Sequence, residues 1–457
     1  MKASKLLSTH APLSVHSKNP RYFDDGTGKA ILLSGSHTWS TIVDRGETYP
    51  PPRFDFDGFL DMLQERGHNF TRLWTQELAG KPAPGDKSSK ASFNAPLPWL
   101  RTGPGKAADG LPKFNLNQLN PEYFERLGSR VRAMRDRGMY ASVMLFEGWA
   151  LEYAPKHACW AWHPFNIKNN INGIDGDPQN TGKGRATHSL DIPAITSIQE
   201  AYVRKVIETL NEYDNIFFEI SNESRFYYSK AWQYHFIKYI KATEKELPKQ
   251  HLVMMVGYGT ACIPYLWNSP ADIIGLNTLT NWLEHRDPFK IDPPIMPPDK
   301  ISMLDTDHLW GTGGRRDWVW MSLTRGHHPI FMDFYPLENQ DYGHPPTKLS
   351  VWKNTQINMG YALQYSRKMD LSKAQPRPDL ALSHFCLANP GREYLVYLPK
   401  GGKTVVDITA VKGSVSVEWF NPANGKTAVS KKTITGGDIR EFIAPFKGDA
   451  VLFLQRT

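Results

Sequence analysis

The hydrophobic and polar positions of this chain follow two alternating patterns over most of its length. Short runs of β-branched and aromatic residues are followed by longer stretches in which apolar residues recur every three or four positions, the spacing of an amphipathic helix. The clearest run, 215–222, is apolar until it ends in an amide, and it lies between predicted helices at 197–213 and 230–247. Eight such strand segments are expected, at 30–34, 69–74, 139–147, 215–222, 251–257, 272–277, 300–305 and 329–333.

Helices with a single apolar face are predicted between most of these strands. One apolar face is formed by Phe124, Leu127, Val131 and Met134, and Gly138 ends that helix. The further helices are expected at 56–66, 197–213, 230–247, 318–325 and 349–369. Eight strand-then-helix alternations with right-handed crossovers are the sequence form of an α/β fold of the (β/α)8 TIM-barrel type.

The pattern changes at about residue 380, where strands follow one another without helices between them. Strands are expected at 382–387, 393–398, 404–408, 414–419 and 450–454. Gly401-Gly402 and Asn424-Gly425 supply turns. This spacing favours a small antiparallel β-sandwich at 377–457 after a barrel at 1–376 that begins with an extended lead-in. The sandwich either binds glycan or only stabilises the barrel; core packing accounts for its Tyr394, Tyr397 and Trp419 equally well.

Two long segments have no clear period and are predicted to be loops. Residues 75–120 are rich in Pro, Gly and Lys, and residues 149–195 follow the third strand. Loops of this length in a compact domain usually carry function. We expect these two loops to form the sides of a cleft. A cleft closed in this way favours a pocket, and cleavage from a chain end (exo action), over an open groove.

Composition adds limits on partners and compartment. The formal net charge is +8, but Lys and Arg are scattered among acids, which is compatible with an acidic polysaccharide and does not indicate nucleic acid. The three cysteines are distant and odd in number, so no disulfide framework is expected. No stretch has the roughly twenty apolar residues of a membrane helix. The first residues are too polar for a secretory signal, so the compartment stays open: secreted or periplasmic if a leader has been removed, otherwise cytoplasmic.

The barrel topology itself selects candidate site residues, because active sites of such barrels lie at the C-terminal ends of the strands. The residues at those ends are rich in carboxylates and aromatic rings. They are His37, Trp39, Arg72, Trp74, Glu147, Trp149, Asn222, Glu223, Tyr258, Asn277, Asp305, Asp307, His308, Asp333 and Tyr335.

Two carboxylates on opposite sides of a barrel opening are what cleavage of a glycosidic bond requires. One protonates the leaving oxygen, and the other meets the developing oxocarbenium ion. The fourth and seventh strands of a barrel are nearly diametric, so Glu223 and Asp305 are expected to face each other across a sugar. Trp39, Trp74, Trp149 and Trp310 either stack on sugar or pack the loops.

Three of these features together resemble the clan A retaining glycoside hydrolases: Ser221-Asn222-Glu223 closing the fourth strand, Arg72 on the second, and an acid ending the seventh. The segments 22–26 and 34–39 and the trailing sandwich are similar to the cellulase-like and family 140-like branch, whose C-terminal domain is of a collagen-binding type. The resemblance implies Glu223 as acid/base and Asn222 as the amide that holds the hydroxyl next to the anomeric carbon.

The chain departs from that clan at the nucleophile, which is usually Glu. Residues 300–308 offer Asp305 and Asp307 instead. Asp305 falls where the strand ends and is the first choice, with Asp307 second; Asp333 is a third candidate, more suited to binding a substrate hydroxyl. Retention of configuration requires carboxyl groups roughly 5–5.5 Å apart, whereas a separation beyond about 6.5 Å favours inversion.

The sequence therefore predicts a retaining glycoside hydrolase that acts on an oligosaccharide or polysaccharide. No metal or organic cofactor is required, and neither nucleic acid nor membrane is an expected partner. Two alternatives use the same residues: a catalytically inactive carbohydrate-binding barrel, since fold alone does not guarantee chemistry, and a transglycosidase. Arg72 either ties strand ends together or also fixes the charge state of the nucleophile.

Overall fold

The computed structural model gives the arrangement of nine stretches of the chain. They are residues 11–39, 41–75, 77–82, 90–152, 159–257, 262–276, 288–336, 346–430 and 432–457.

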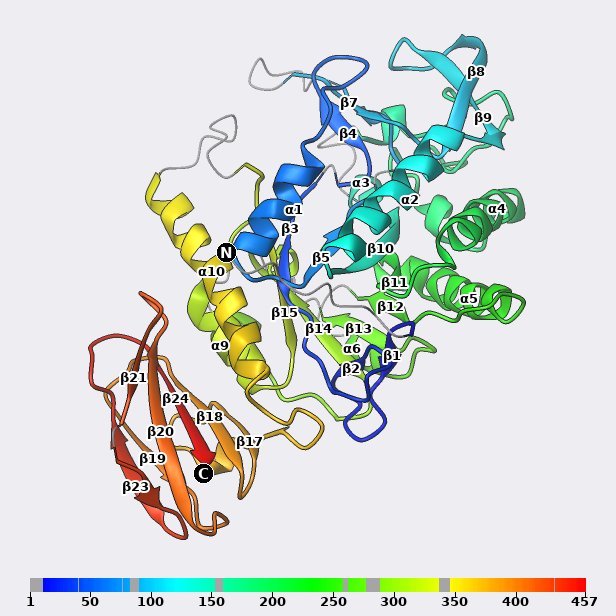
Figure 1. Cartoon of the computed structure of the whole chain (residues 1–457). Helices are drawn as coiled ribbons and strands as arrows, with labels where there is room; N and C mark the ends of the chain where they lie inside the picture. Colours follow the sequence, from blue (N-terminus) through cyan, green and yellow to red (C-terminus); the bar gives the residue numbers. More distant parts are fainter. Residues whose placement is uncertain are drawn as a thin grey trace. The chain divides into compact units, whose positions relative to one another are not determined.

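Eight parallel strands form one sheet, which confirms the predicted (β/α)8 fold class (Figure 1). Neighbouring strands pair in parallel register, and their residues are buried on both faces, as strands enclosed by helices must be. In the order of the sheet the strands are β3 (Gly35–His37), β15 (His328–Met332), β14 (Ile301–Asp305), β13 (Ile273–Leu276), β12 (Val253–Val256), β11 (Ile216–Asn222), β10 (Tyr140–Glu147) and β5 (Phe70–Leu73).

The two end strands, β3 and β5, approach each other closely. The Asn69 amide donates to the Ser34 carbonyl at 3.3 Å, and the Thr71 hydroxyl donates to the Ser36 carbonyl at 2.8 Å. A Cβ on Gly35 would lie 1.9 Å from the Phe70 carbonyl oxygen, so only glycine permits this approach. The sheet is therefore a nearly closed barrel.

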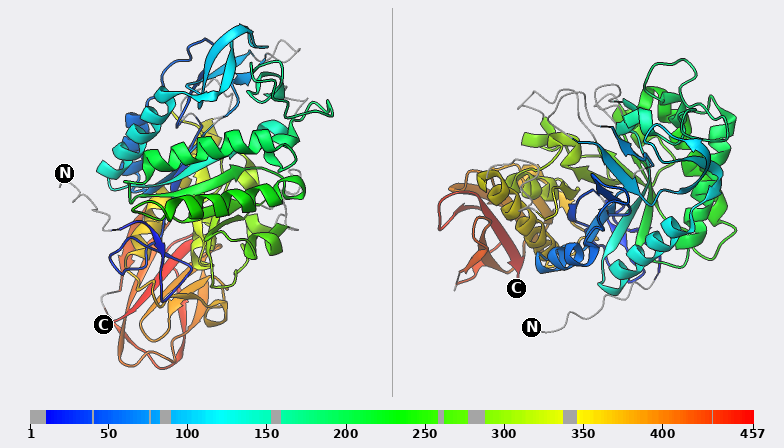
Figure 2. Two further views of the ribbon diagram at one scale, coloured as in Figure 1. Left: turned by 90° about the vertical axis from the view of Figure 1, so that its right-hand side faces the viewer. Right: turned by 90° about the horizontal axis from the view of Figure 1, so that it is seen from above.

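The chain forms two compact units that both contribute strands to this sheet and are described separately. In the unit of Thr38–Leu60 and Arg72–Gly275, helices α2 (Pro121–Asp136), α4 (Pro193–Leu210) and α5 (Phe226–Glu244) cover the strands. Helix α4 lies between α2 and α5, and α2 and α5 pack on β10 and β11 (Figure 2). Helix α2 begins at Pro121 because the Asn120 side chain accepts the Glu122 amide hydrogen.

The first barrel strand is shifted from its predicted position at 30–34 to Gly35–His37. The apolar residues Leu32 and Leu33 are buried as expected, but they do not form a strand ladder. Side chains satisfy this backbone instead: the Leu33 amide donates to His328 Nδ1 at 3.0 Å, and the Ser34 amide donates to Asn69 Oδ1 at 3.0 Å. Burial was predicted correctly from hydrophobicity, whereas the hydrogen-bonding partners were not visible in the pattern.

The prediction that residues 75–120 form a long loop with little structure of its own is wrong. Strands β4 (Asp44–Gly46), β7 (Ser92–Ala95) and β6 (Gly80–Lys81) form a three-stranded sheet, and β8 (Trp99–Lys106) pairs with β9 (Pro112–Leu119). The ladder between β8 and β9 contains register shifts between Trp99 and Leu100 and between Arg101 and Lys106, so no regular alternation of polar and apolar residues appears in the sequence.

The segment after β10 is mostly irregular within its described residues, as predicted, but contains three short helices. They are α3 (Trp149–Glu152), η1 (Cys159–Trp162) and η2 (Arg185–His188). Asparagine amides fix the irregular backbone: Asn169 Nδ2 donates to the carbonyls of Ala161 and His163 at 2.8 and 2.9 Å. The segment is therefore a packed surface element.

The unit of Ser14–His37, Asp61–Thr71 and Leu276–Thr457 contains β14, β15, helices α9 (Arg316–Thr324) and α10 (Pro346–Ser366), and the antiparallel C-terminal strands. One antiparallel sheet has the order β16-β17-β18-β24-β20-β21 with β22 beside β20, and a separate ribbon is formed by β19 and β23. Their bounds are β16 Gln375–Pro376, β17 Cys386–Asn389, β18 Glu393–Leu398, β19 Lys403–Asp407, β20 Ser414–Asn421, β21 Lys426–Val429, β22 Ile434–Thr435, β23 Ile439–Ile443 and β24 Ala450–Arg456.

Helices α9 and α10 pack directly against this C-terminal sheet. Trp320 on α9 stacks on Tyr397 with ring centres 6.3 Å apart. Glu418 on β20 accepts hydrogen bonds from the Tyr365 hydroxyl and the Lys368 ammonium, each at 2.5 Å. Arg316 binds both carboxylate oxygens of Asp449, at 3.1 and 2.7 Å. Aromatic burial and charged hydrogen bonds thus tie the C-terminal strands to the last two barrel helices.

Two further sequence expectations concern cysteines and membrane segments. Cys159, Cys262 and Cys386 are all buried, and none of the three forms a disulfide. Among the described helices, none combines the length and the apolar character needed to span a bilayer.

Candidate active site

The C-terminal ends of β5 and β11 are joined by a buried arginine. The Arg72 guanidinium binds both oxygens of the Glu219 carboxylate, and its Nη2 also donates to Asn222 Oδ1 at 2.9 Å. Arg72 and Glu219 are both fully buried, and the guanidinium lies 4.7 Å from the Trp74 ring centre. Arg72 therefore ties the strands together, as one of its two predicted roles required, and orients the Asn222 amide.

Glu147, at the end of β10, holds the other side of that amide. Asn222 Nδ2 donates to its two oxygens at 3.1 and 3.3 Å, the Trp74 indole donates at 3.0 Å, and the Trp149 backbone amide donates at 2.8 Å. Burial raises the pKa of Glu147 to about 7, although these hydrogen bonds and the Arg72 charge act in the opposite direction. The oxygen and nitrogen of Asn222 thus have fixed, distinguishable positions.

We expect Glu147→Gln to change how stability depends on pH. Because the pKa of Glu147 is about 7 in the folded protein against an ordinary value of 4.5, the folded state retains a proton that the unfolded chain has lost. The wild type therefore loses stability as pH rises from 4.5 to 7, by up to about 3 kcal/mol from this group. Glutamine does not titrate, so the stability difference between wild type and variant should shift in favour of the variant over that range.

Urea unfolding of both proteins at pH 4.5 and 7.5 measures this difference. An identical difference at the two pH values would show that the pKa of Glu147 is the same in the folded and unfolded states. Glu125→Gln, at an exposed position of α2, serves as the control for removing an ordinary carboxylate.

Glu223 follows β11 directly and has an unusual backbone conformation. Its φ is +47°, in the left-handed region that costs a residue with a Cβ roughly 1–2 kcal/mol. The residue is 4% exposed. Such strain persists only where the surroundings hold it, and it occurs preferentially at functional sites. The conformation could not be predicted from sequence, because Glu has no particular preference for it.

A second group of carboxylate side chains lies at the end of β14. Asp305 Oδ1 accepts from His37 Nε2 at 2.9 Å and from the Asp307 backbone amide at 2.9 Å. Asp305 is 3% exposed and His37 is fully buried. Asp305 is the last residue of β14, whereas Asp307 begins the short helix α8 (Asp307–Trp310). The structure thus brings together two of the predicted residues, His37 and Asp305, that lie far apart in the sequence.

Asp305, Asp307 and His308 form a compact cluster. Each offers a carboxylate oxygen or an imidazole nitrogen, and these atoms lie within 4.8 Å of one another. His308 Nε2 is 3.6 Å from Asp307 Oδ2. These atom types can bind a divalent cation, and they also bind the hydroxyl groups of a sugar.

The other predicted site residues differ in exposure. Asp333 is fully buried and accepts a hydrogen bond from Gln356; burial raises the pKa of Asp333 well above its usual range, opposed by the charge of Arg66. Trp39 contacts Trp74 edge-on at 6.4 Å, and Trp310 contacts the buried Trp318 edge-on at 5.8 Å. The partly exposed side chains are those of Trp39, Trp149, Trp310 and Tyr335. Tyr258 and Asn277 lie outside the described residues.

Four residues of this region were not predicted from the sequence: Glu77, His188, Glu219 and Ser224. Glu219 did carry a signal, since a carboxylate between Phe218 and Ile220 of a buried strand requires a cationic partner. His188 and Glu77 belong to segments without periodicity, and only the fold brings them together, at 2.9 Å.

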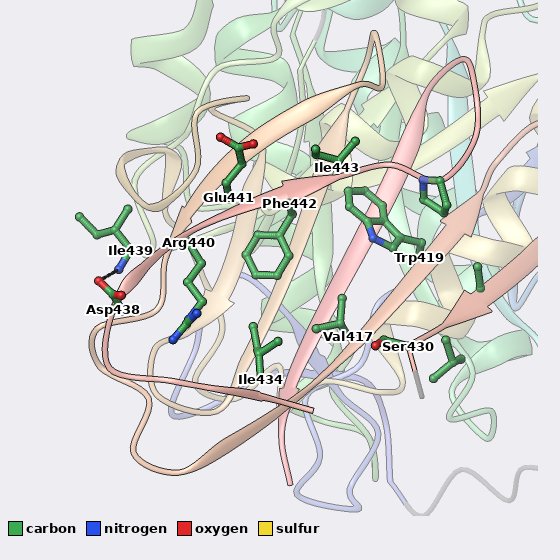
Figure 3. Close-up of a pocket in the computed structure, with 13 residues that line it drawn as sticks. Val417, Trp419, Ser430, Ile434, Asp438, Ile439, Arg440, Glu441, Phe442 and Ile443 are labelled. Carbon is green, nitrogen blue, oxygen red and sulfur yellow. Dashed lines mark hydrogen bonds between the residues drawn. The ribbon is translucent and has the colours of Figure 1, made fainter. Parts of the chain in front are cut away.

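A separate hollow lies on the C-terminal strands (Figure 3). Its volume is ≈ 570 Å³, and Trp419 and Phe442 line it together with Arg440 and Glu441. Tyr394 and Tyr397 are buried in the C-terminal core, which favours packing for these two rings, whereas Trp419 borders the hollow.

Comparisons with protein-family models match two parts of the chain. Residues 88–259 match a family described as "Domain of unknown function (DUF6298)", and residues 381–455 match "Putative collagen-binding domain of a collagenase". Among proteins with curated descriptions, none matches the sequence.

Solved structures share the fold over nearly the whole chain. A protein described as "Glycoside hydrolase" has a TM-score of 0.62 at 14% identity, covering 98% of this chain and 97% of its own. A glycoside hydrolase family 5 structure from Bacteroides vulgatus ATCC 8482 has a TM-score of 0.60 at 12% identity, covering 98% of this chain and 95% of its own. The chain thus shares its barrel fold with these glycoside hydrolases, and its C-terminal β-domain resembles the collagen-binding type.

Proposed function

We propose that this protein is a retaining glycoside hydrolase in which Glu223 is the acid/base and Asp305 the nucleophile. The observation that carries the proposal is the placement of two carboxylates at strand ends: Glu223 directly follows β11, and β14 ends in Asp305. β12 and β13 separate these strands in the nearly closed sheet. The end of a barrel strand is the position from which catalytic groups act.

The proposed reaction is a double displacement. Glu223 donates a proton to the leaving oxygen while Asp305 attacks the anomeric carbon, which forms a glycosyl-enzyme ester. Glu223, now a carboxylate, then removes a proton from water, and that water releases the sugar from Asp305. Each of the two displacements inverts the configuration at the anomeric carbon, so the product has the same configuration as the substrate.

The surroundings of Asp305 and Asn222 support these roles. His37 and the Asp307 amide both donate to Asp305 Oδ1, which orients the carboxylate. Asn222 is held between Arg72 and Glu147, as an amide that recognises one sugar hydroxyl should be. Asp307 lies in the helix after the strand, which makes Asp305 the better candidate for nucleophile.

The substrate we propose is an oligosaccharide or polysaccharide, cleaved from a chain end. Support for exo action comes from the segments after β5 and β10, which contain β6 to β9 and three short helices and so can form the walls of a pocket. We also propose that this protein is related to the family 140-like branch of the glycoside hydrolases.

An activity screen on aryl glycosides and polysaccharides tests the proposal, with product configuration followed by NMR. We expect hydrolysis whose first product has the configuration of the substrate. A product of opposite configuration would contradict the double displacement. Sugar binding without turnover would favour an inactive carbohydrate-binding barrel, and transfer to a sugar acceptor in preference to water would favour a transglycosidase.

A further inference from the structure

The left-handed backbone of Glu223 needs a structural cause. The peptide that precedes it is fixed at its carbonyl: the Asn222 oxygen accepts from the Gly148 amide at 2.7 Å and from the Ser221 hydroxyl at 3.1 Å. The Ser221 hydroxyl also bonds to the hydroxyl of Ser224, on the far side of Glu223. The two serines therefore bracket the strained residue.

A buried chain of hydrogen bonds continues from Ser224. Its hydroxyl bonds to His188 Nδ1 at 2.8 Å, and His188 Nε2 bonds to Glu77 Oε1 at 2.9 Å. Ser221, Ser224, His188 and Glu77 are each at most 1% exposed. No substrate could reach the Ser224 hydroxyl at that burial, so this Ser-His-Glu arrangement is unsuited to nucleophilic catalysis.

The direction of the hydrogen bonds follows from the carboxylate. Burial raises the pKa of Glu77, but the imidazoles of His163 and His188 lower it by more, and the net result is a pKa of about 2. The Glu77 carboxylate is therefore ionised at neutral pH and can only accept hydrogen bonds. His188 therefore donates through Nε2, and in the neutral ring Nδ1 accepts the Ser224 hydroxyl hydrogen. The single hydroxyl hydrogen of Ser221 is then shared between Ser224 Oγ and the Asn222 carbonyl oxygen. The ring plane is fixed by stacking on Trp232 with centres 4.3 Å apart.

We propose that Glu77, His188 and Ser224 are positioning residues that hold Glu223 in its left-handed conformation, a role that rests on the proposed function. Without this chain Glu223 would relax by rotating about its strained φ, which moves the carboxyl group away from the leaving oxygen. Close packing supports the same role: a Cβ on Gly148 would lie 2.4 Å from Ser224 Oγ and 2.5 Å from its backbone nitrogen. Displacement of a catalytic group by about 1 Å can cost roughly 100-fold in rate.

The test uses Ser224→Ala and Glu77→Gln in the full chain, assayed on aryl glycosides with good and poor leaving groups. Poor leaving groups depend on the acid and good ones do not. We expect kcat/KM to fall about 10- to 100-fold on poor leaving groups and less than about 3-fold on good ones, with the double variant no worse than the stronger single one. Equal losses on both substrate types would indicate a merely structural role and overturn the proposal.

Ser229→Ala is the matched control. Ser229 is also fully buried, on α5, and its hydroxyl donates to the Arg225 carbonyl at 3.0 Å. It should leave the ratio of activities on the two substrate types unchanged.

Crystal structures of the two variants give a result that does not depend on activity. We expect the φ of Glu223 to leave the left-handed region in Ser224→Ala. A φ that stays near +47° in both variants overturns the positioning role even if the wild type is an active glycosidase. A wild type without glycosidase activity, in contrast, defeats the proposed function, whatever the φ in the variants.

Discussion

Replacing Glu223 by glutamine is expected to lower kcat/KM by roughly 10²–10⁴-fold on glycosides with poor leaving groups. Glutamine has nearly the shape of the acid but no proton to give, so the leaving oxygen would depart with a full negative charge. Glycosides of acidic phenols need no such help in the first step. On those substrates we expect the glycosyl-enzyme to accumulate, visible as a burst of phenol followed by slow turnover, because the second step still requires a base.

External azide gives a second measurement on the same variant. Azide needs no general base, so it should restore turnover of the activated substrate and yield a glycosyl azide of retained configuration. Glu200→Gln, which removes a partly exposed carboxylate on α4, should behave as wild type. Undiminished hydrolysis of poor leaving groups by Glu223→Gln would rule out Glu223 as the acid.

Asp305→Ala is expected to reduce activity on all substrates by on the order of 10³-fold or more, because both steps pass through the ester on this carboxylate. The loss should not depend on the leaving group, in contrast to Glu223→Gln. Azide should act from the space left by the shortened side chain, attack the anomeric carbon once, and give a glycosyl azide of inverted configuration.

Asp307→Ala distinguishes the two aspartates. If Asp305 is the nucleophile, Asp307→Ala should keep measurable hydrolysis with retained configuration. In the presence of azide it should form no glycosyl azide of inverted configuration. The reverse result, with azide rescue in Asp307→Ala only, would assign the nucleophile to Asp307. Trapping the intermediate with a fluorinated glycoside and identifying the labelled peptide gives an independent answer.

The sequence was sufficient to predict the barrel and the ends of its fourth and seventh strands, because hydrophobic periodicity is a strong signal over long elements. Asn222 and Asp305 lie at the last positions of β11 and β14, and Arg72 on β5 contacts Asn222 across β10. What the pattern could not give is which polar residues pair. The contacts of Arg72 with Glu219 and of His37 with Asp305 join residues 147 and 268 positions apart.

The errors have physical causes as well. The first barrel strand was predicted too early because Leu32 and Leu33 are apolar and buried, yet their backbone is bonded by side chains and not by a strand. Strands β6 to β9 were predicted as loop because short strands with register shifts lack regular alternation. Local periodicity reports burial well, and it reports backbone pairing only when that pairing is regular.

The packing of β18, β20 and β24 against α9 and α10 affects how the chain folds during synthesis. Both helices leave the ribosome before β20 and β24 are synthesised, so Trp320 and Tyr365 are without their partners on those strands during that interval. Exposed apolar surface of this kind favours aggregation and chaperone binding. A fragment ending near residue 376 should therefore be trapped in inclusion bodies, and co-expression of 377–457 as a separate chain should rescue its solubility.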